Sequence, residues 1–456
     1  MKTNIAARLA PRATTFEGTP AKRLTDAQAL RRALVSCLLW EDQFYEDGEA
    51  IADRIKRLTL AVEPTVAANL AIEARNQFKL RHAPLWVARW LASGTAAQKG
   101  VVAPLLAQII QRPDELTEFL ALYWKDGKTP LAASVKRGLA VAFQKFNAYS
   151  LAKYNRDDAI KLRDVLFLVH AKPKDEEQAA TWKLLVEGKL PAPDTWEVQL
   201  SAGADKKATW TRLMTEGKLG ALALLRNLRN MQEAKVDESV IRAALNVCDT
   251  ERVLPFRFVG AARFAPRLEP ELEQAMYRCV AGQPKLGGRT ALIVDTSPSM
   301  WMANVSGKSQ MTRFDAAAAL AVLCREVCDN VAVYAFNERA YEVPARRGFA
   351  LRDALAQTKG NASCGGLAVA LANERGYDRV IVLTDGQWHY SRSGNVVDSE
   401  GDAHIVSPAP LTDKAYLVNV AAARNAVGSA KWQMLDGWSE AILDYIVASE
   451  TPITLG

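Results

Sequence analysis

The chain has 456 residues, of which 49% are hydrophobic and 24% charged, and its net charge is +7. This composition is that of a folded globular protein, and it excludes a disordered or fibrous chain. The length favours two large domains over a single one.

The positive charge is concentrated in the first part of the chain. Lysine and arginine outnumber aspartate and glutamate by 42 to 33 in residues 1–282, a difference of +9, whereas the balance in residues 283–456 is 16 to 18, or −2. Such asymmetry favours a polyanionic partner for the first part, with a merely basic surface as the alternative.

The first twenty residues contain no apolar run of the length that a signal peptide needs, and no later segment has the roughly 18 apolar residues of a membrane span. The six cysteines are scattered without CxxC spacing, and Cys324 and Cys328 are expected to be core thiols. We therefore expect a cytoplasmic protein with no membrane partner.

From Leu24 to about Val280, apolar residues recur at helical spacing with breaks at glycine or proline, and strand signals are almost absent. Short helices that follow one another over such a length predict an α-solenoid of HEAT-like repeats rather than a compact bundle. Typical segments are DAQALRRALVSCLLW, PTVAANLAIEARNQF, LAASVKRGLAVAFQKF and LGALALLRNLRNM.

The segment AGQPKLGGRT marks a boundary, which divides the chain into domains at 1–282 and 283–456. Beyond it, strand-like runs alternate with helical ones. The predicted strands are TALIVDTS, VAVYAF, RVIVLTDG and YLVNVAA, and the predicted helices are RFDAAAALAVLCREVCD, GGLAVALANERG and WSEAILDYIVAS. Strands that are apolar on both faces predict a parallel sheet covered by helices.

Polar oxygens follow the predicted strands. Asp295, Ser297 and Ser299 alternate in ALIVDTSPSM, so their side chains point to one side, and Asp385 ends another strand. Ser363, in the loop KGNASCGGLAVAL, offers a further hydroxyl. Ligands bind at the carboxyl ends of parallel strands, and hard oxygens suit Mg²⁺, with Mn²⁺ as the alternative metal. An ordinary helix cap and turn is the other interpretation of the first motif.

These residues resemble the metal-ion-dependent adhesion site of von Willebrand factor A domains, whose pattern is DxSxS, then a threonine, then an aspartate. Asp295, Ser297 and Ser299 match the first motif, and Asp385 matches the last. Ser363 stands where the family usually has threonine, so the hydroxyl is kept. The resemblance implies a doubly wound, Rossmann-like domain that holds a divalent metal.

Four phrases of the first part resemble the TROVE domain of the Ro ribonucleoprotein family. They are TPAKRLTDAQALRRALVSCLLWEDQFYEDGE, KLRDVLFLVHAKPK, ALLRNLRNM and LPFRFVGAARFAP. A helical array followed by a von Willebrand factor A domain is also the order of this family, so the chain is similar to a bacterial-type Ro protein throughout. The resemblance implies α + α/β architecture, in which the α-solenoid is closed into a ring by the A domain.

The resemblance also implies RNA partners: small non-coding Y-like RNA on the outer surface and single-stranded ends of misfolded RNA in a central hole. Lys153, Arg156 and His170 fall on or beside family positions for Y RNA, with Arg156 one place out of register. A lysine and an arginine one turn apart would form a phosphate clamp. For His170, a core histidine is the alternative.

Further cations extend this predicted surface. They are Lys161, Arg163 and Lys172, together with Arg226 and Arg229, which lie at i and i+3 and so on one helical face. A solvated helix face is the alternative for the last two.

Two hypotheses of function follow. The first is a monomeric, non-catalytic RNA-binding ring protein of RNA quality control, with an exoribonuclease or another protein as a further partner at the A domain. The alternative is a protein-recruitment module whose metal captures an acidic partner. A hydrolase is disfavoured, because four histidines and isolated serines supply no base and nucleophile together.

Overall fold

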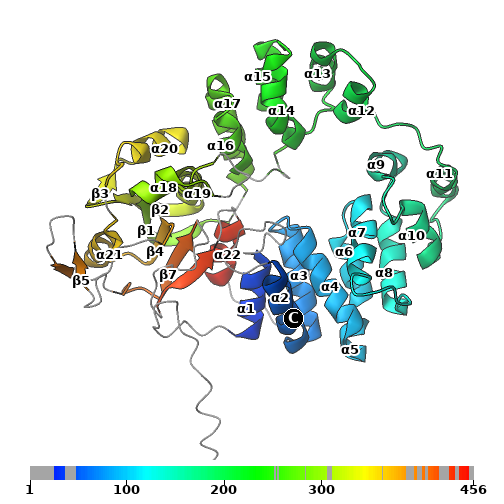
Figure 1. Cartoon of the computed structure of the whole chain (residues 1–456), viewed down its shortest axis with the longest axis horizontal. Helices are drawn as coiled ribbons and strands as arrows, with labels where there is room; N and C mark the ends of the chain where they lie inside the picture. Colours follow the sequence, from blue (N-terminus) through cyan, green and yellow to red (C-terminus); the bar gives the residue numbers. More distant parts are fainter. Residues whose placement is uncertain are drawn as a thin grey trace, which may run out of the picture. The chain divides into compact units, whose positions relative to one another are not determined.

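The computed structural model of the chain describes residues 25–35, 48–250, 253, 256–282, 284–305, 311–361, 363–386, 395–397, 403–405, 409–420, 431–436 and 441–450. These residues form two compact units, which meet in the sequence between Lys218 and Leu219. We call the described residues up to Lys218 the repeat unit and those from Leu219 onward the sheet unit. Figure 1 labels the elements of both.

The repeat unit consists of helices throughout the residues that the structure describes. The helices are α1 (Asp26–Val35), α2 (Gly48–Ala61), α3 (Pro64–Asn76), α4 (His82–Ser93), α5 (Ala96–Gly100), α6 (Val102–Ile109), α7 (Pro113–Tyr123), α8 (Ala133–Phe143), α9 (Ala148–Tyr154), α10 (Leu162–Val169), α11 (Glu176–Val186), α12 (Trp196–Ser201) and α13 (Lys206–Thr215). Side-chain oxygens cap several of them: Asn147, Asp175 and Asp205 each accept a hydrogen bond from the backbone N–H three residues later.

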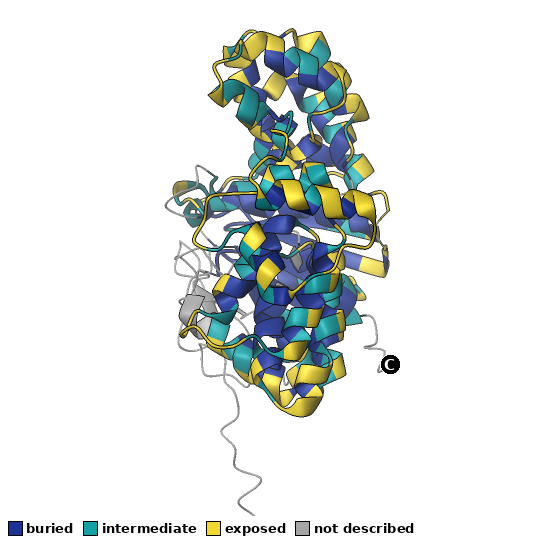
Figure 2. Cartoon of the chain, turned by 90° about the vertical axis from the view of Figure 1, so that its right-hand side faces the viewer, coloured by how far each residue is buried: buried dark blue, intermediate teal, exposed yellow. Residues whose placement is uncertain are grey.

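Helices that are near one another along the chain pack side by side, for example α3 on α4 and α6 on α8. Figure 2 shows the resulting pattern, in which helices are buried on one side and exposed on the other. Buried cations join helices of successive repeats: Arg75 of α3 donates to the Ile109 carbonyl at 2.9 Å and to Glu115 of α7 at 2.6 Å. The predicted series of helical repeats is thus confirmed.

The sheet unit begins with four α-helices and a short 3₁₀ helix. They are α14 (Ala221–Glu233), α15 (Glu238–Val247), α16 (Phe256–Ala262), η2 (Pro266–Leu268) and α17 (Glu269–Val280). Helices α16 and α17 pack on helices of the α/β part, and Glu273 accepts a hydrogen bond of 2.7 Å from the backbone N–H of Phe349. Because of this packing the compact unit begins at Leu219, although helices give way to strands only after Val280.

The α/β part contains a six-stranded sheet with the strand order β3-β2-β1-β4-β7-β8. Its strands are β1 (Leu286–Asp295), β2 (Cys328–Phe336), β3 (Ala340–Val343), β4 (Arg379–Thr384), β7 (Lys414–Asn419) and β8 (Gln433–Asp436), and β5 (Asn395–Val397) pairs separately with β6 (Ala403–Ile405). The predicted parallel pairing holds for five strands, but the edge strand β3 runs antiparallel to β2. A short antiparallel edge strand is a common addition to such sheets.

Helices cover both faces of the sheet, as the doubly wound prediction requires. The helices of this part are α18 (Pro298–Met302), α19 (Arg313–Val327), α20 (Gly348–Ala356), α21 (Gly365–Glu374) and α22 (Ala441–Glu450). Ala368 and Val369 of α21 pack in one core with Ile293 of β1. Leu292 and Val294, which point the opposite way, are equally buried, and α19 contacts the same strand.

Within the described residues, no helix has the length and apolar character needed to cross a membrane. Cys324 and Cys328 are buried free thiols, as predicted, although only Cys324 is helical, since α19 ends at Val327 and Cys328 begins β2.

Candidate metal centre and nucleic-acid interface

The first acidic residue of the predicted metal centre ends the central strand β1. Asp295 is fully buried; its Oδ1 accepts a 2.9 Å hydrogen bond from the backbone N–H of Ser297, and its Oδ2 accepts a 2.6 Å bond from the Thr384 hydroxyl. Thr384 ends β4, which pairs with β1. The sheet register therefore brings the loops of Asp295 and Asp385 together, as the sequence predicted.

The two carboxylates are close enough to influence one another. Burial and the nearby Asp385 carboxylate raise the pKa of Asp295 to about 7, although hydrogen bonds from Ser297 and Thr384 oppose the shift. Asp385 is also fully buried. Two buried carboxylates at one sheet edge repel each other, so a nearby positive charge stabilises them.

Three hydroxyls belong to the predicted donor set. Ser297 stands at the N-cap of α18, yet its side chain makes no capping bond and instead lies 3.3 Å from the Ser299 hydroxyl. The buried Oγ of Ser363 has no hydrogen-bond partner among the residues that the structure describes. Asp295 does accept the hydrogen bond of a turn, as the alternative interpretation expected, but the serine hydroxyls take no part in that turn. A buried hydroxyl without a partner fits a role as a metal ligand.

Neutral hydroxyls are essential to this candidate site. No three described His, Cys, Asp or Glu side chains come together in a way that could hold a metal. With only two acids, the five residues Asp295, Ser297, Ser299, Ser363 and Asp385 offer the hard, weakly charged oxygen set that suits Mg²⁺ and leaves it attractive to a further acidic group.

A cation beside this site escaped prediction from the sequence. Arg313, the first residue of α19, places its Nη1 2.8 Å from Oδ2 of Asp385, and its side chain is 19% exposed. One signal was available in the sequence: a basic residue in the first turn of a helix opposes the helix dipole, which suggests that a nearby anion holds it there.

Two aromatic residues lie in the helices that carry Ser299 and Arg313. The rings of Trp301 and Phe314 stack with their centroids 3.7 Å apart, and Lys359 lies 5.1 Å from the centre of the Trp301 ring. Phe314 is buried, whereas Met302, the next residue after Trp301, is 80% exposed. An exposed methionine can contact the surface of another protein.

In the repeat unit, Lys153 and Arg156 are both exposed. The prediction placed them one turn apart on a helix, but Arg156 lies outside the helix that contains Lys153. Helix α9 ends at Tyr154, and Asn155 already has an extended backbone. Lys153 lies 5.9 Å from the ring centres of both Tyr149 and Tyr154. Lys153 therefore lies beside two aromatic rings, and the pair does not form the predicted helical clamp.

Helix α10 carries three further predicted residues. His170 ends the helix in a left-handed conformation with φ of 54° and is exposed, so the core-histidine alternative is wrong. Arg163 is exposed as well, whereas Lys161 forms an ion pair with Asp157. Lys172 follows the helix and is exposed.

Phe167 is a further candidate of this helix that the sequence-based prediction missed. It is 59% exposed, and it lies four residues after Arg163, hence on the same helical face, while the left-handed cap His170 follows three residues later. The signal lay in the periodicity, because Phe167 falls outside the apolar stripe of Leu162, Val165, Leu166 and Val169. We call Arg163, Phe167 and His170 the α10 face.

Arg226 and Arg229 lie on α14, which belongs to the sheet unit, and both are exposed on one helical face as expected. Arg229 is paired with Glu233 one turn later at 3.0 Å. The structure therefore does not bring these two residues together with the candidates of the repeat unit within one compact body.

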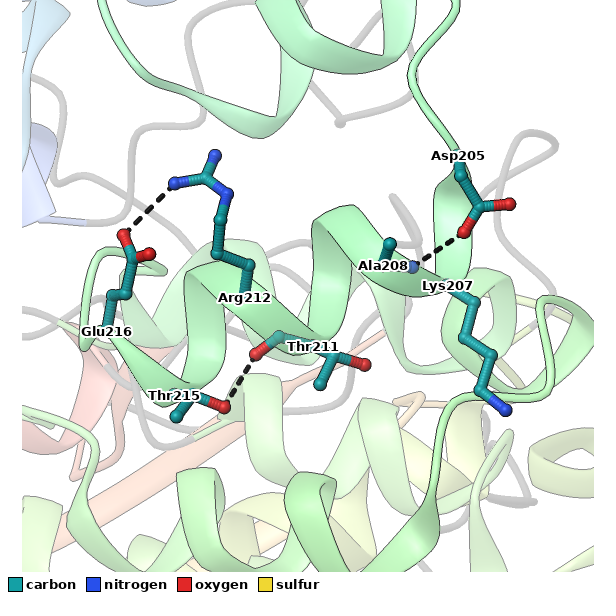
Figure 3. Close-up of a pocket in the computed structure, with 7 residues that line it drawn as sticks. All are labelled: Asp205, Lys207, Ala208, Thr211, Arg212, Thr215 and Glu216. Carbon is teal, nitrogen blue, oxygen red and sulfur yellow. Dashed lines mark hydrogen bonds and ion pairs between the residues drawn. The ribbon is translucent and has the colours of Figure 1, made fainter.

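An open pocket on α13 carries further cations, shown in Figure 3. There Arg212 donates to Glu216 at 3.0 Å and to Asp194 at 2.8 Å, and Lys218 pairs with Asp194 at 3.1 Å. Hydrogen bonds from Arg212 and Lys218 hold the pKa of Asp194 far below its usual range. Because Arg212, the arginine that lines the pocket, is already paired with carboxylates and Asp205 and Glu216 also line it, we do not assign this pocket to RNA.

Comparisons with known proteins place these features in context. Residues 179–279 match the model of the TROVE domain. Telomerase protein component 1 of Rattus norvegicus and of Mus musculus are each 34% identical to this chain over 90 residues, which are 18% of this chain and 3% of those proteins. The chain thus spans only a small part of the length of these relatives.

The fold is similar to that in a crystal structure of the Ro (RSR) protein of Deinococcus radiodurans, with a TM-score of 0.64 and 19% sequence identity. The similarity covers 93% of this chain and 99% of that one. The domain match includes the phrase ALLRNLRNM. It begins after the phrase KLRDVLFLVHAKPK, which precedes residue 179. Residues 179–279 are therefore similar to the TROVE domain, and the chain as a whole shares its fold with a Ro protein.

Proposed function

We propose that this protein binds RNA without catalysing a reaction, and that the surface of α9 and α10 holds a small structured non-coding RNA of the Y type. Single-stranded ends of misfolded RNA are the second proposed ligand, in a ring closed by the A domain, and RNA quality control in the cytoplasm is the proposed role. The match of residues 179–279 to the TROVE domain, the fold shared with a Ro protein and the +9 charge of residues 1–282 support the proposal.

The observation that carries the proposal is the combination of exposed cations on and beside α9 and α10 with an exposed aromatic ring on α10. Among the described residues, Lys153, Arg156 and Lys172 have no ion pair with a carboxylate, so their charge is available to phosphates. Phe167 adds a ring on which an unpaired base can stack. Cations and stacking rings together are characteristic of single-stranded or loop RNA recognition.

The test is a salt series on binding of a hairpin RNA with a single-stranded tail. Affinity that comes from phosphates should fall with salt, with a slope of log K against log salt near −0.7 per single-strand phosphate neutralised. Replacing Lys153 and Arg156 together by alanine should make the slope shallower by roughly one to two units.

Replacing Lys206 and Lys207 of α13 by alanine removes the same charge elsewhere in the repeat unit and serves as the control. Both lysines are exposed. Equal slopes in the wild type and the Lys153/Arg156 variant would place the RNA surface elsewhere. A wild type that shows no salt-dependent binding would refute RNA binding itself.

A second candidate function is recruitment of an acidic protein partner by the metal centre. The exposed Met302, which follows Trp301 in the helix of Ser299, favours it, because an exposed methionine can pack against a protein surface. Asp295, Ser297, Ser299, Ser363 and Asp385 would hold Mg²⁺ or Mn²⁺, and the metal would supply a binding point for a carboxylate. In that case neither substitution on α9 and α10 would change partner binding.

A further inference from the structure

One cation inside the protein already pairs with an acid of the proposed metal centre. Nη1 of Arg313 lies 2.8 Å from Oδ2 of Asp385, whose side chain is fully buried. The Nε of Arg313 is buried too and has no hydrogen-bond partner in the part of the chain that the structure describes. The guanidinium is thus held at Asp385, while its other buried donor remains unsatisfied.

The position of Arg313 in its helix makes this arrangement costly. The backbone of α19 begins with a capping box, in which Thr312 and Asp315 satisfy the first N–H groups, and Arg313 is the next residue after the cap. The N-terminus of a helix carries a partial positive charge, which repels a cation. Both the helix dipole and the unsatisfied Nε oppose the placement, so the attraction of Asp385 must outweigh them.

The electrostatics of the site explain that attraction. Asp295 and Asp385 are two fully buried carboxylates at the ends of paired strands, and their like charges repel each other. A guanidinium relieves this repulsion, and a divalent metal would relieve it as well. The guanidinium and the metal cannot both bind Asp385 at full strength, because two cations so close together repel each other in a poorly screened environment.

We propose that Arg313 is an internal competitor of the divalent metal, which pairs with Asp385 and thereby sets the metal affinity of the site. The inference assumes the proposed metal centre, but it is independent of RNA binding. It concerns a residue outside the DxSxS pattern and outside the other two motifs. Removing the guanidinium should therefore tighten metal binding, whereas removing a true ligand should abolish it.

The experiment is calorimetric titration of Mn²⁺ into the full chain at constant ionic strength. The variants are Arg313→Gln and, as a matched control, Arg325→Gln, which removes the same charge from α19 about 18 Å along the helix. Asp295→Ala, which removes one of the proposed metal-binding side chains, gives the baseline. Arg313→Gln should bind Mn²⁺ at least about tenfold more tightly than the wild type. Arg325→Gln should match the wild type, because the distance exceeds the screening length.

The outcomes separate the alternatives. Binding by Arg313→Gln but not by the wild type would be the strongest form of the expected result. Equal or weaker binding by Arg313→Gln would overturn the proposal, and so would equal gains in both glutamine variants, since the effect would then be one of overall charge. Absence of binding in all variants would refute the metal centre, while leaving the RNA proposal unaffected.

Thermal unfolding provides a second readout. In chelator, Arg313→Gln should melt below the wild type, because two buried carboxylates lose their counter-ion. Added Mn²⁺ should raise its melting temperature by more than it raises that of the wild type. A smaller increase than in the wild type would contradict competition. If the glutamine variant does not fold, Arg313→Lys keeps a cation with fewer donors, and its Mn²⁺ affinity should lie at or above that of the wild type; a lower affinity would contradict the proposal.

Discussion

Among single residues, Phe167 is an exposed aromatic ring on the surface that we propose for RNA binding. The apolar stripe of α10 is completed without it, and the ring remains 59% exposed between Arg163 and His170 on the α10 face. Solvent exposure of a phenylalanine on a helix that already has a buried stripe brings no gain in folding free energy. A base that stacks on the ring would supply the missing burial.

We expect Phe167→Ala to weaken binding of a single-stranded RNA tail by about 1–3 kcal/mol, the usual contribution of one stacked base. The slope of log K against log salt should not change, since no phosphate contact is lost. Fluorescence anisotropy over the salt series measures both quantities.

Val247→Ala is the control for this prediction, because Val247 is an 83% exposed apolar residue at the end of α15. An alanine variant of Phe167 with wild-type affinity would show that the ring makes no contact with RNA. A changed slope would indicate that the substitution disturbs the neighbouring cations instead.

At the scale of elements, strand β4 and helix α22 are joined by a largely buried ion pair. Nε of Arg379 donates to Oε1 of Glu450 at 2.5 Å, and Lys414 of β7 contacts Oε2 at 2.8 Å. The Arg379 side chain is only 1% exposed. Burial raises the pKa of Glu450, but hydrogen bonds from Arg379 and Lys414 outweigh it and lower the pKa overall.

Glu450→Gln should therefore lower the free energy of unfolding of the sheet unit at pH 7 by roughly 2 kcal/mol, because Arg379 keeps its charge in a buried position. The contribution of a carboxylate with a lowered pKa is present above its ordinary pKa, near 4.3, and disappears as the pH falls through the folded value. The difference between variant and wild type should shrink accordingly below about pH 4.

Urea unfolding at several pH values measures this difference. Glu374→Gln makes the same change at the exposed end of α21 and should leave stability nearly unaltered. A difference that persists undiminished at low pH would mean that packing of α22, not the ion pair, is responsible.

The periodicity of apolar residues predicted the helices and strands well, but it predicted the residues at which they end poorly. Alternation of apolar strands and helices predicted the α/β part, because strands buried on both faces need helices on both sides. The antiparallel strand β3 was missed, since four residues at an edge carry too little pattern. The end of α9 at Tyr154 was missed as well, and with it the true geometry of Lys153 and Arg156.

For the whole molecule, the distribution of charge predicts two independent functions. Residues 1–282 carry the +9 excess, whereas the proposed metal ligands lie between Asp295 and Asp385. The surface of α9 and α10 belongs to the repeat unit and the metal centre to the sheet unit. RNA affinity should therefore change by less than about twofold when the metal is removed.

This prediction can be checked by measuring RNA binding with and without EDTA, at an ionic strength set by monovalent salt. The RNA should be a hairpin whose fold does not need Mg²⁺, so that the chelator acts on the protein alone. A large loss of affinity in EDTA would show that the metal centre and the RNA surface are coupled. Unchanged binding by Asp295→Ala would provide an independent check.

The sequence alone determined the classes of element, the division of charge and the identity of the oxygen-bearing loops. These properties are local, since periodicity, composition and motif spacing are read within a few residues. It also identified Asp295 and Asp385 as strand ends, because continuous apolar runs stop there.

Only the tertiary structure decided which groups meet. Arg313 and Asp385 are separated by 72 positions in the sequence, and Arg75 reaches Glu115 across 40. Exposure of Phe167 and His170, burial of Ser363 and the packing of α16 and α17 on the α/β part likewise depend on neighbours from distant segments. Charge pairs and burial are properties of the packed chain, and no local pattern encodes the partner of a side chain.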